Sequence, residues 1–236
     1  MTKYVFVTGA NKGIGYEIAR QLAEKNYHVF LGARNKELGQ KAVESLGLEN
    51  VSLIQVDIAD TESILNSVDE IGEVTDNLDL LVNNDGVVLD INILPSELRL
   101  ETLFRSFEIN FLGTFQMIQA FLPLVKEANG GKIVNITTDM SSQTIFDNCD
   151  LPQLNTLGYN SSKTAVNSLT LAFGKEFESD GPEIFGVTPG LISTNQNGNV
   201  PLGKTPAEGA QVIVKYAISD KSYNGKILNE GGMIPW

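Results

Sequence analysis

The chain has 236 residues, of which 42% are hydrophobic and 19% charged, and its formal net charge at neutral pH is −12. These values are typical of a globular protein with a sizeable core and exclude an intrinsically disordered chain. The acidic excess speaks against nucleic acid or an anionic membrane as the main partner, and an anionic cofactor would need local positive groups to hold it.

Strand-like and helix-like segments alternate along the chain. The pattern predicts strands at residues 3–7, 29–32, 51–56, 78–82, 132–136 and 184–187, with a short last strand at 227–228. It predicts helices at about 14–22, 36–46, 61–71, 98–128, 159–177 and 206–218, the long one bent at Pro123. Most strands are near-continuously apolar, which favours a parallel sheet covered on both faces. We therefore predict one doubly wound, Rossmann-type α/β domain over residues 1–236.

Cysteine and histidine are each present once. With Cys149 and His28 alone, an internal disulfide, a cysteine-based zinc site and most Ser-His-Asp arrangements are excluded, and we expect no metal site. The first residues enter a strand without a signal peptide, and no apolar run reaches transmembrane length. The expected location is the cytoplasm.

A glycine-rich turn, Thr8-Gly-Ala-Asn-Lys-Gly-Ile-Gly15, joins the first strand to the first helix. Such a turn lets the backbone come close to a phosphate, and the helix start offers free N–H groups and the positive end of the helix dipole. The spacing Gly-x-x-x-Gly-x-Gly differs from the dinucleotide fingerprint Gly-x-Gly-x-x-Gly. An ordinary glycine-rich turn between a strand and a helix is therefore the alternative.

Two basic residues favour a phosphorylated cofactor. Arg34 follows the second strand, where NAD-binding folds usually place an acidic residue for the ribose 2′-hydroxyl. A guanidinium suits a 2′-phosphate, and Lys12 in the glycine turn could reach the same group. Taken singly, each is also explained as a solvated surface charge; together they favour NADPH. Asp57, after the third strand, could accept from an adenine amino group or cap the next helix, as Asp60 or Thr61 could.

Tyr159 and Lys163 are four residues apart in a predicted helix and so lie on one face. Moving a tyrosine pKa from about 10 towards 7 needs about 4 kcal/mol of preference for the phenolate. An adjacent ammonium in a partly dry site supplies an energy of that order. The pair predicts acid–base chemistry, although such a spacing also arises by chance.

Five motifs follow one another along the chain: Thr8 to Gly15, Asn83-Asn-Asp-Gly86, Asn110, Tyr159-x-x-x-Lys163 and Pro189-Gly190. This order resembles the short-chain dehydrogenase/reductase family over the whole chain, and Asn11 to Gly15 with Arg34 is most similar to its NADPH-dependent carbonyl reductase branch. The resemblance implies an oxidoreductase that uses NADP(H) to reduce a ketone or aldehyde, a small-molecule carbonyl, to an alcohol.

The resemblance also implies roles for single residues. Tyr159 would be the general acid, Lys163 would lower the Tyr159 pKa and bind the nicotinamide ribose, and Asn110 would hold a water that links Lys163 to solvent. Thr194 would lie near the nicotinamide carboxamide. The implied cofactor contacts are Gly9, Asn11, Lys12, Gly13, Ile14, Gly15, Arg34, Asp57, Ile58, Asn83, Tyr159, Lys163, Pro189, Gly190, Ile192 and Thr194.

The first departure from the family pattern is the catalytic serine, which is expected after the fifth strand. That stretch reads Asn135-Ile-Thr-Thr138, so Thr138 would supply the hydroxyl. Threonine has the required donor and acceptor but is bulkier and stiffer at χ1. Ser141 and Ser142 are the alternatives, both further past the strand end.

Two further departures concern assembly and the cofactor. Thr138 and Tyr159 are 21 residues apart, more than the family usually shows, and the extra residues fall around Asp147 to Leu157, before a helix that many relatives use for dimer contacts. We therefore expect a monomer or a weak homodimer. Asp85 replaces the usual alanine of Asn-Asn-Ala-Gly, so either its carboxylate points away from the cofactor phosphates or it reduces the affinity.

A second hypothesis follows from these departures. A protein of the same fold could bind NADP(H) as a sensor or signalling protein with little or no turnover. Thr138 and Asp85 favour this hypothesis, whereas Tyr159, Lys163 and Asn110 favour the enzyme. We favour the enzyme, because a chain that had abandoned catalysis would be expected to lose those three residues.

Overall fold

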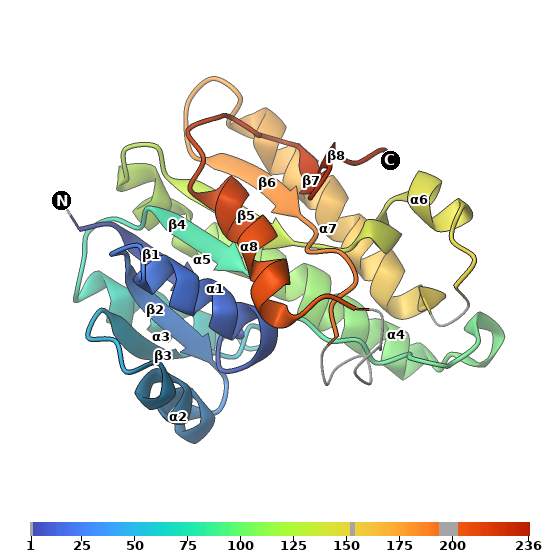
Figure 1. Cartoon of the computed structure of the whole chain (residues 1–236), viewed down its shortest axis with the longest axis horizontal. Helices are drawn as coiled ribbons and strands as arrows, with labels where there is room; N and C mark the ends of the chain where they lie inside the picture. The colour runs from blue at the N-terminus through green and yellow to red at the C-terminus, as the bar shows by residue number, and fades with distance from the viewer. Residues whose placement is uncertain (1, 152–153, 194–202) are drawn as a thin grey trace.

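The computed structural model describes residues 2–151, 154–193 and 203–236. Within these residues the strands form one sheet in the order β3-β2-β1-β4-β5-β6-β7-β8, which confirms the doubly wound, Rossmann-type fold (Figure 1). β1 to β7 pair in parallel and β8 pairs antiparallel with β7. The strands are β1 Tyr4–Val7, β2 His28–Ala33, β3 Val51–Gln55, β4 Leu80–Asn83, β5 Lys132–Ile136, β6 Glu183–Val187, β7 Ile227–Asn229 and β8 Gly232–Met233.

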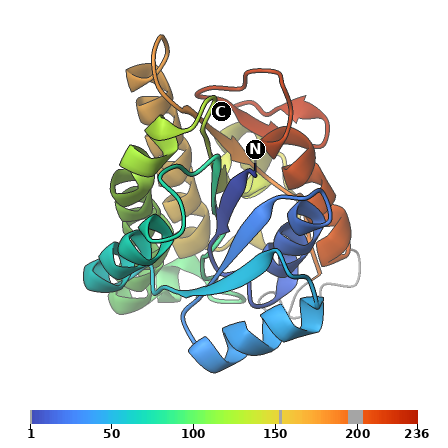
Figure 2. The same ribbon diagram turned by 90° about the vertical axis from the view of Figure 1, so that its left-hand side faces the viewer.

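Helices cover both faces of this sheet, as Figure 2 shows in a view along its edge. α1, α2 and α8 bury their apolar residues on one face, and α3, α5 and α7 on the other. The helices are α1 Gly13–Ala23, α2 Lys36–Leu46, α3 Thr61–Gly72, α4 Leu100–Phe107, α5 Thr114–Glu127, α6 Gln143–Asp147, α7 Leu157–Glu176 and α8 Pro206–Ala217. Shorter helical segments are η1 Pro95–Glu97, η2 Glu108–Gly113 and η3 Asp139–Ser141.

The apolar strands explain the two cores. Side chains along a strand point alternately to opposite faces, so Val5 and Val7 of β1 join the core under α1 and α8, while Phe6 joins the core under α3 and α5. Near-continuous apolar sequence is therefore needed to cover both faces, which is why the strand pattern predicted this layering.

The predicted helix at 98–128 is wrong as one element. The structure has α4, the π-helical segment η2 and α5 in its place. α5 continues through Pro123, and the departure from regular α geometry comes earlier, in η2. Helical periodicity alone does not separate a π turn from an α turn, because both keep apolar residues on one face.

The order of the strands determines where a ligand can bind. β1 lies between β2 and β4, so successive connections leave this point in opposite directions along the sheet. A crevice forms at the carboxyl ends of the strands at such a switch point. Among the described helices, none combines the length and the apolar sequence that crossing a bilayer requires.

Candidate active site

The glycine turn leaves β1 at the switch point with its backbone close to β4. Gly9 and Gly13 have φ angles of +60° and +61°, a region that favours glycine. A Cβ atom on Gly15 would lie 2.5 Å from Asn84 Nδ2 and 2.6 Å from the Gly9 carbonyl oxygen, so a side chain there would clash. The Asn84 amide donates to the carbonyl oxygens of Thr8 and Gly9 at 2.9 and 3.2 Å and fixes the turn against the end of β4.

The start of α1 is suited to an anion. Lys12 is its N-cap residue and makes no side-chain capping hydrogen bond, and the first turn contains no acidic residue. A Cβ atom on Gly13 would meet nothing within 4 Å. First-turn N–H groups without a side-chain partner, the helix dipole and open space above the turn together fit a phosphate group. Asn11 and Ile14 flank Lys12 and Gly13 in this segment.

Arg34 and Asp57 lie at the ends of neighbouring strands on one side of the turn. Arg34 Nη1 is 4.0 Å from Asp57 Oδ2, and the Arg34 side chain is 67% exposed, so it is accessible to a ligand. Asp57 Oδ1 accepts from the Ala59 N–H, whereas Asp60 caps α3 by accepting from Glu62 and Ser63. The alternative that Asp57 caps α3 is therefore wrong. Ile58 is buried with only 3% exposed and packs in the core under α3.

Asn83, the last residue of β4, directs its side chain into the sheet. Its Nδ2 donates to Asn135 Oδ1 of β5 at 2.9 Å, and Asn135 Nδ2 donates to Thr170 Oγ1 of α7. Asn83 Oδ1 is buried and has no hydrogen-bond partner among the described residues. Through these amides the side chain of Asn83 links β4 to β5 and α7.

Asn110 lies in η2 and ties three elements together. Its Oδ1 accepts from the Val87 N–H at 2.8 Å, and its Nδ2 donates to the Val87 carbonyl oxygen and to Ser162 Oγ of α7. A Cβ atom on Gly86 would lie 3.1 Å from Asn110 Oδ1 and 3.4 Å from Lys163 Nζ. The structure thus brings Asn110 and Lys163 together at Gly86, in the segment after β4.

Tyr159 and Lys163 lie in the first two turns of α7. Burial raises the pKa of Tyr159 to about 12, and the phenol makes no hydrogen bond with any described residue. Lys163 Nζ donates to the Ile136 carbonyl oxygen at the end of β5 at 2.8 Å. Burial lowers the pKa of Lys163 to about 8, and Asp85 opposes that shift. The expectation that Lys163 lowers the Tyr159 pKa stays a prediction, and in this structure burial is the cause that acts on the Tyr159 pKa.

The threonine after β5 has a free hydroxyl proton, whereas the two serines that could replace it are engaged. Thr138 Oγ1 accepts from the Met140 N–H at 3.3 Å and donates to no described residue. Ser141 is buried and bonded to Thr137 and to Asn167 of α7. Ser142 is buried and caps α6. Of the three candidates, Thr138 fits a substrate-binding hydroxyl best.

The segment after β6 closes the other side of the crevice. Gly190 has a φ angle of +80°, and its N–H donates to Thr188 Oγ1. A Cβ atom on Gly209 would lie 2.6 Å from Ile192 Cδ1 and 3.3 Å from Pro189 Cβ, so Pro189 and Ile192 pack on the start of α8. Thr194 lies outside the described residues.

Comparison with known proteins identifies the family. The model of the family described as short chain dehydrogenase matches residues 3–204. The chain belongs to the short-chain dehydrogenase family. The short-chain dehydrogenase/reductase tropE of Talaromyces stipitatus is 33% identical over 262 residues, with 98% of this chain and 97% of the relative covered.

Two solved structures of similar proteins cover almost the whole of this short-chain dehydrogenase. An NADPH-bound carbonyl reductase from chicken has a TM-score of 0.88 at 26% identity, with 100% of this chain and 99% of the other covered. An alcohol dehydrogenase from the archaeon Thermococcus sibiricus, complexed with 5-hydroxy-NADP, has a TM-score of 0.80 at 27% identity, with 97% and 96% covered.

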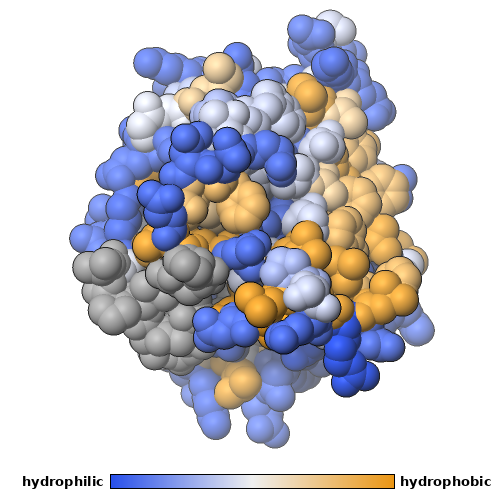
Figure 3. Space-filling model, turned by 90° about the vertical axis from the view of Figure 1, so that its right-hand side faces the viewer, coloured by the Kyte–Doolittle hydropathy of each residue, from blue (hydrophilic) through white to orange (hydrophobic). Residues whose placement is uncertain are grey.

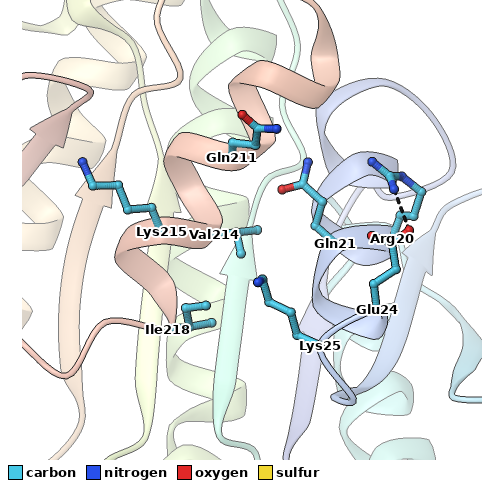
Figure 4. Close-up of a pocket in the computed structure, with 8 residues that line it drawn as sticks. All are labelled: Arg20, Gln21, Glu24, Lys25, Gln211, Val214, Lys215 and Ile218. Atoms are coloured by element: carbon cyan, nitrogen blue, oxygen red, sulfur yellow. Dashed lines mark hydrogen bonds and ion pairs between the residues drawn. The ribbon is translucent and has the colours of Figure 1, made fainter.

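A surface groove of this short-chain dehydrogenase lies away from the crevice. It has a volume of about 680 Å³ and runs between α1 and α8, with Arg20, Gln21 and Lys25 on one side and Gln211, Val214 and Lys215 on the other (Figure 4). None of the site residues predicted from the sequence lines it. We therefore place the candidate active site at the carboxyl ends of the strands and not in this groove.

Sequence reasoning missed one buried residue of the site. Asp90, in the segment after β4, accepts a hydrogen bond from the Gly158 N–H at 2.6 Å, and only 1% of Asp90 is exposed. Gly158 directly precedes Tyr159, so Asp90 holds the start of the helix that carries the phenol. No sequence signal marked Asp90, because a single aspartate in a loop has no characteristic spacing.

Proposed function

We propose that this short-chain dehydrogenase is an NADPH-dependent reductase of a ketone or aldehyde. The observation that carries the proposal is the phenol of Tyr159, a residue that is half-buried. It lies in the first turn of α7 without a hydrogen-bond partner among the described residues, four residues before Lys163, whose Nζ reaches the end of β5. A protonated, unpartnered phenol at the ligand-binding edge of the sheet is the group that a carbonyl reduction needs.

The cofactor assignment is supported by the fit of the glycine turn. The pyrophosphate would lie at the N-terminus of α1, where no side chain caps the helix. Exposed Arg34 and Lys12 would bind the 2′-phosphate, and Lys163 the nicotinamide ribose. The NADPH-bound chicken carbonyl reductase supports the same assignment. When bound, the reduced nicotinamide supplies the hydride.

The residues of the chain would supply the proton and orient the carbonyl. With its pKa raised to about 12, Tyr159 keeps its proton at neutral pH and can donate it to the carbonyl oxygen as negative charge develops there. The free hydroxyl proton of Thr138 would donate a second hydrogen bond to the same oxygen. Lys163 would hold its positive charge near the phenol and stabilise the phenolate that remains.

The test is turnover of generic carbonyl compounds, such as isatin and quinones, with NADPH and with NADH. We expect oxidation of NADPH with a clear preference over NADH, and Tyr159→Phe should lower kcat by roughly 10²- to 10⁴-fold while still binding NADPH. Retained turnover in Tyr159→Phe would show that another group donates the proton.

A sensor of NADP(H) with little turnover is the second candidate, and Asp85 favours it. The Asp85 side chain lies against Gly9 of the glycine turn, where a carboxylate opposes an anionic cofactor. Tight NADPH binding without consumption of any carbonyl compound would support the sensor. Failure to bind either nucleotide would overturn both candidates.

A further inference from the structure

Asp85 lies against the glycine turn and makes hydrogen bonds with both its main chain and its side chain. A Cβ atom on Gly9 would lie 3.0 Å from Cα, Cβ and Oδ1 of Asp85, so the two residues are in contact. The Asp85 N–H donates to Thr8 Oγ1 at 3.0 Å, and Asp85 Oδ1 accepts from the Gly86 N–H at 2.9 Å. Asp85 therefore lies against the glycine turn, which favours the second of the two outcomes predicted from the sequence, a reduced cofactor affinity.

Charged groups from the neighbouring elements face this carboxyl group. Burial raises the pKa of Asp85 above its ordinary value, and Asp57 after β3 adds to the rise. Three groups lower the pKa of Asp85 instead: the Gly86 N–H, Arg34 after β2 and Lys163 on α7. Lys12 of the glycine turn, which is exposed, and Tyr159 on α7 are further titratable groups at this edge of the sheet.

A cofactor phosphate would change the balance of these charges. The turn next to Asp85 offers the uncapped N-terminus of α1, which is the place for a pyrophosphate. An ionised carboxylate within several ångströms of a phosphate is repelled, and the repulsion is stronger where water is partly excluded. A protonated carboxyl group is neutral and offers an O–H donor to the anion.

We propose that Asp85 couples cofactor binding to proton uptake, because its carboxyl group carries a proton when the pyrophosphate lies at the glycine turn. The inference rests on the proposed NADP(H) function. Its consequence is an affinity that falls with rising pH, by about tenfold per pH unit between the pKa of the free protein and that of the complex. Asp85 thus determines cofactor affinity.

The experiment is calorimetric titration of the full chain with NADPH between pH 6 and 9, in buffers that differ in ionisation enthalpy. The 2′-phosphate itself titrates near pH ~6, so the quantity measured is the difference between the parent and Asp85→Asn. We expect the parent to take up more protons than Asp85→Asn, and Asp85→Asn to bind about tenfold tighter at pH 8, with the gap closing at lower pH.

Asp85→Ala and Glu24→Gln are the control variants. Asp85→Ala also removes the carboxyl group but introduces no amide. Its proton uptake and NADPH affinity should match those of Asp85→Asn, which would show that the amide itself is not the cause. Glu24→Gln removes one negative charge from the opposite end of α1, where Glu24 pairs with Arg20, and should leave proton uptake and affinity as in the parent.

The possible outcomes separate the inference from the function on which it rests. NADPH binding with equal proton uptake and parallel affinity curves in the parent, Asp85→Asn and Asp85→Ala would overturn the inference alone. An equal gain of affinity in Glu24→Gln would also overturn it, because overall charge would then explain the effect. No binding by any of the four proteins at any pH would overturn the proposed function and the inference with it.

Discussion

At the scale of single residues, Thr138 is the residue that we propose to orient the carbonyl group. Its hydroxyl oxygen accepts from the Met140 N–H, and its proton is left for another acceptor. Thr138→Val keeps the shape and removes the hydroxyl, so we expect kcat to fall by roughly 10²- to 10³-fold with little change in NADPH affinity. Steady-state kinetics with a generic quinone substrate would measure this loss.

Thr138→Ser is the matched control for that prediction, since it keeps the hydroxyl and removes only the methyl group. It should retain kcat within a few fold, and thermal denaturation of both variants should show that the fold survives the loss of the Met140 hydrogen bond. A fall in Thr138→Ser as deep as in Thr138→Val would assign the effect to packing instead of the hydroxyl.

At the scale of elements, the start of α7 depends on Asp90. One carboxyl oxygen accepts from the Gly158 N–H, next to Tyr159, while the other is buried without a partner among the described residues. Asp90→Ala would leave this helix N–H unsatisfied and remove an acidic group from the positive end of the helix, which costs about 1–3 kcal/mol of folding free energy. We expect kcat to fall as well, with KM for NADPH less affected, because the phenol loses its anchor.

Asp60→Ala provides a control for the Asp90 prediction. Asp60 caps α3 by accepting from the Glu62 and Ser63 N–H groups, so its loss costs about 1 kcal/mol. Urea denaturation should show a loss of stability in both variants, and only Asp90→Ala should lose kcat. Unchanged kcat in Asp90→Ala would limit Asp90 to a structural role.

Some secondary-structure elements could be predicted from the sequence and others could not. The parallel strands were predictable because apolar runs such as 132–136 match buried strands, and β5 has those bounds in the structure. The interruption of the helix at η2 was not predictable, since a π turn keeps the helical pattern of apolar residues. α6 and β8, with five and two residues, are too short for a periodic signal.

Some features of the candidate site could likewise be predicted from the sequence, and others depend on tertiary contacts. Gly9, Gly13 and Gly15 were predictable because each backbone position there excludes or clashes with a side chain. The direction of the Asp85 and Asn83 side chains was not, because it depends on tertiary contacts with Gly9 and Asn135. The raised pKa of Tyr159 depends on burial, which the spacing of Tyr159 and Lys163 does not encode.

At the scale of the whole molecule, the extra residues before α7 bear on assembly. They begin where α6 ends, and α6 is tied to the chain end because its Thr144 N–H donates to the Trp236 carbonyl oxygen. Apolar side chains on α4 are also exposed, with Leu100 at 59% and Phe104 at 66%, and Figure 3 shows apolar atoms gathered on one side of the face it displays. Our prediction stays a monomer or a weak homodimer.

Light scattering tests this prediction at micromolar concentration. We expect a mass near the 25.6 kDa of one chain, or a mass that rises with concentration towards twice that value. A tetramer that persists on dilution would contradict the prediction.

The free energy of unfolding should depend on pH in the alkaline range, because Lys163 is buried. Burial lowers its pKa from 10.5 to about 8, while the unfolded chain keeps the ordinary value. Between these two values the unfolded state binds more protons than the native state, so the free energy of unfolding rises with pH. For this single group we expect a gain of about 2 kcal/mol between pH 8 and pH 10.

Lys163→Met isolates this contribution, since it fills a similar volume and does not titrate. Urea denaturation of the parent and the variant at both pH values gives four unfolding free energies, and the parent should gain about 2 kcal/mol more than the variant. The range stops at pH 10 because the raised pKa of Tyr159, about 12, makes stability fall as pH rises beyond the ordinary tyrosine value of 10.0. An equal pH response in both proteins would mean that the Lys163 ammonium is not desolvated in the native state, and its assigned place between β5 and α7 would be wrong.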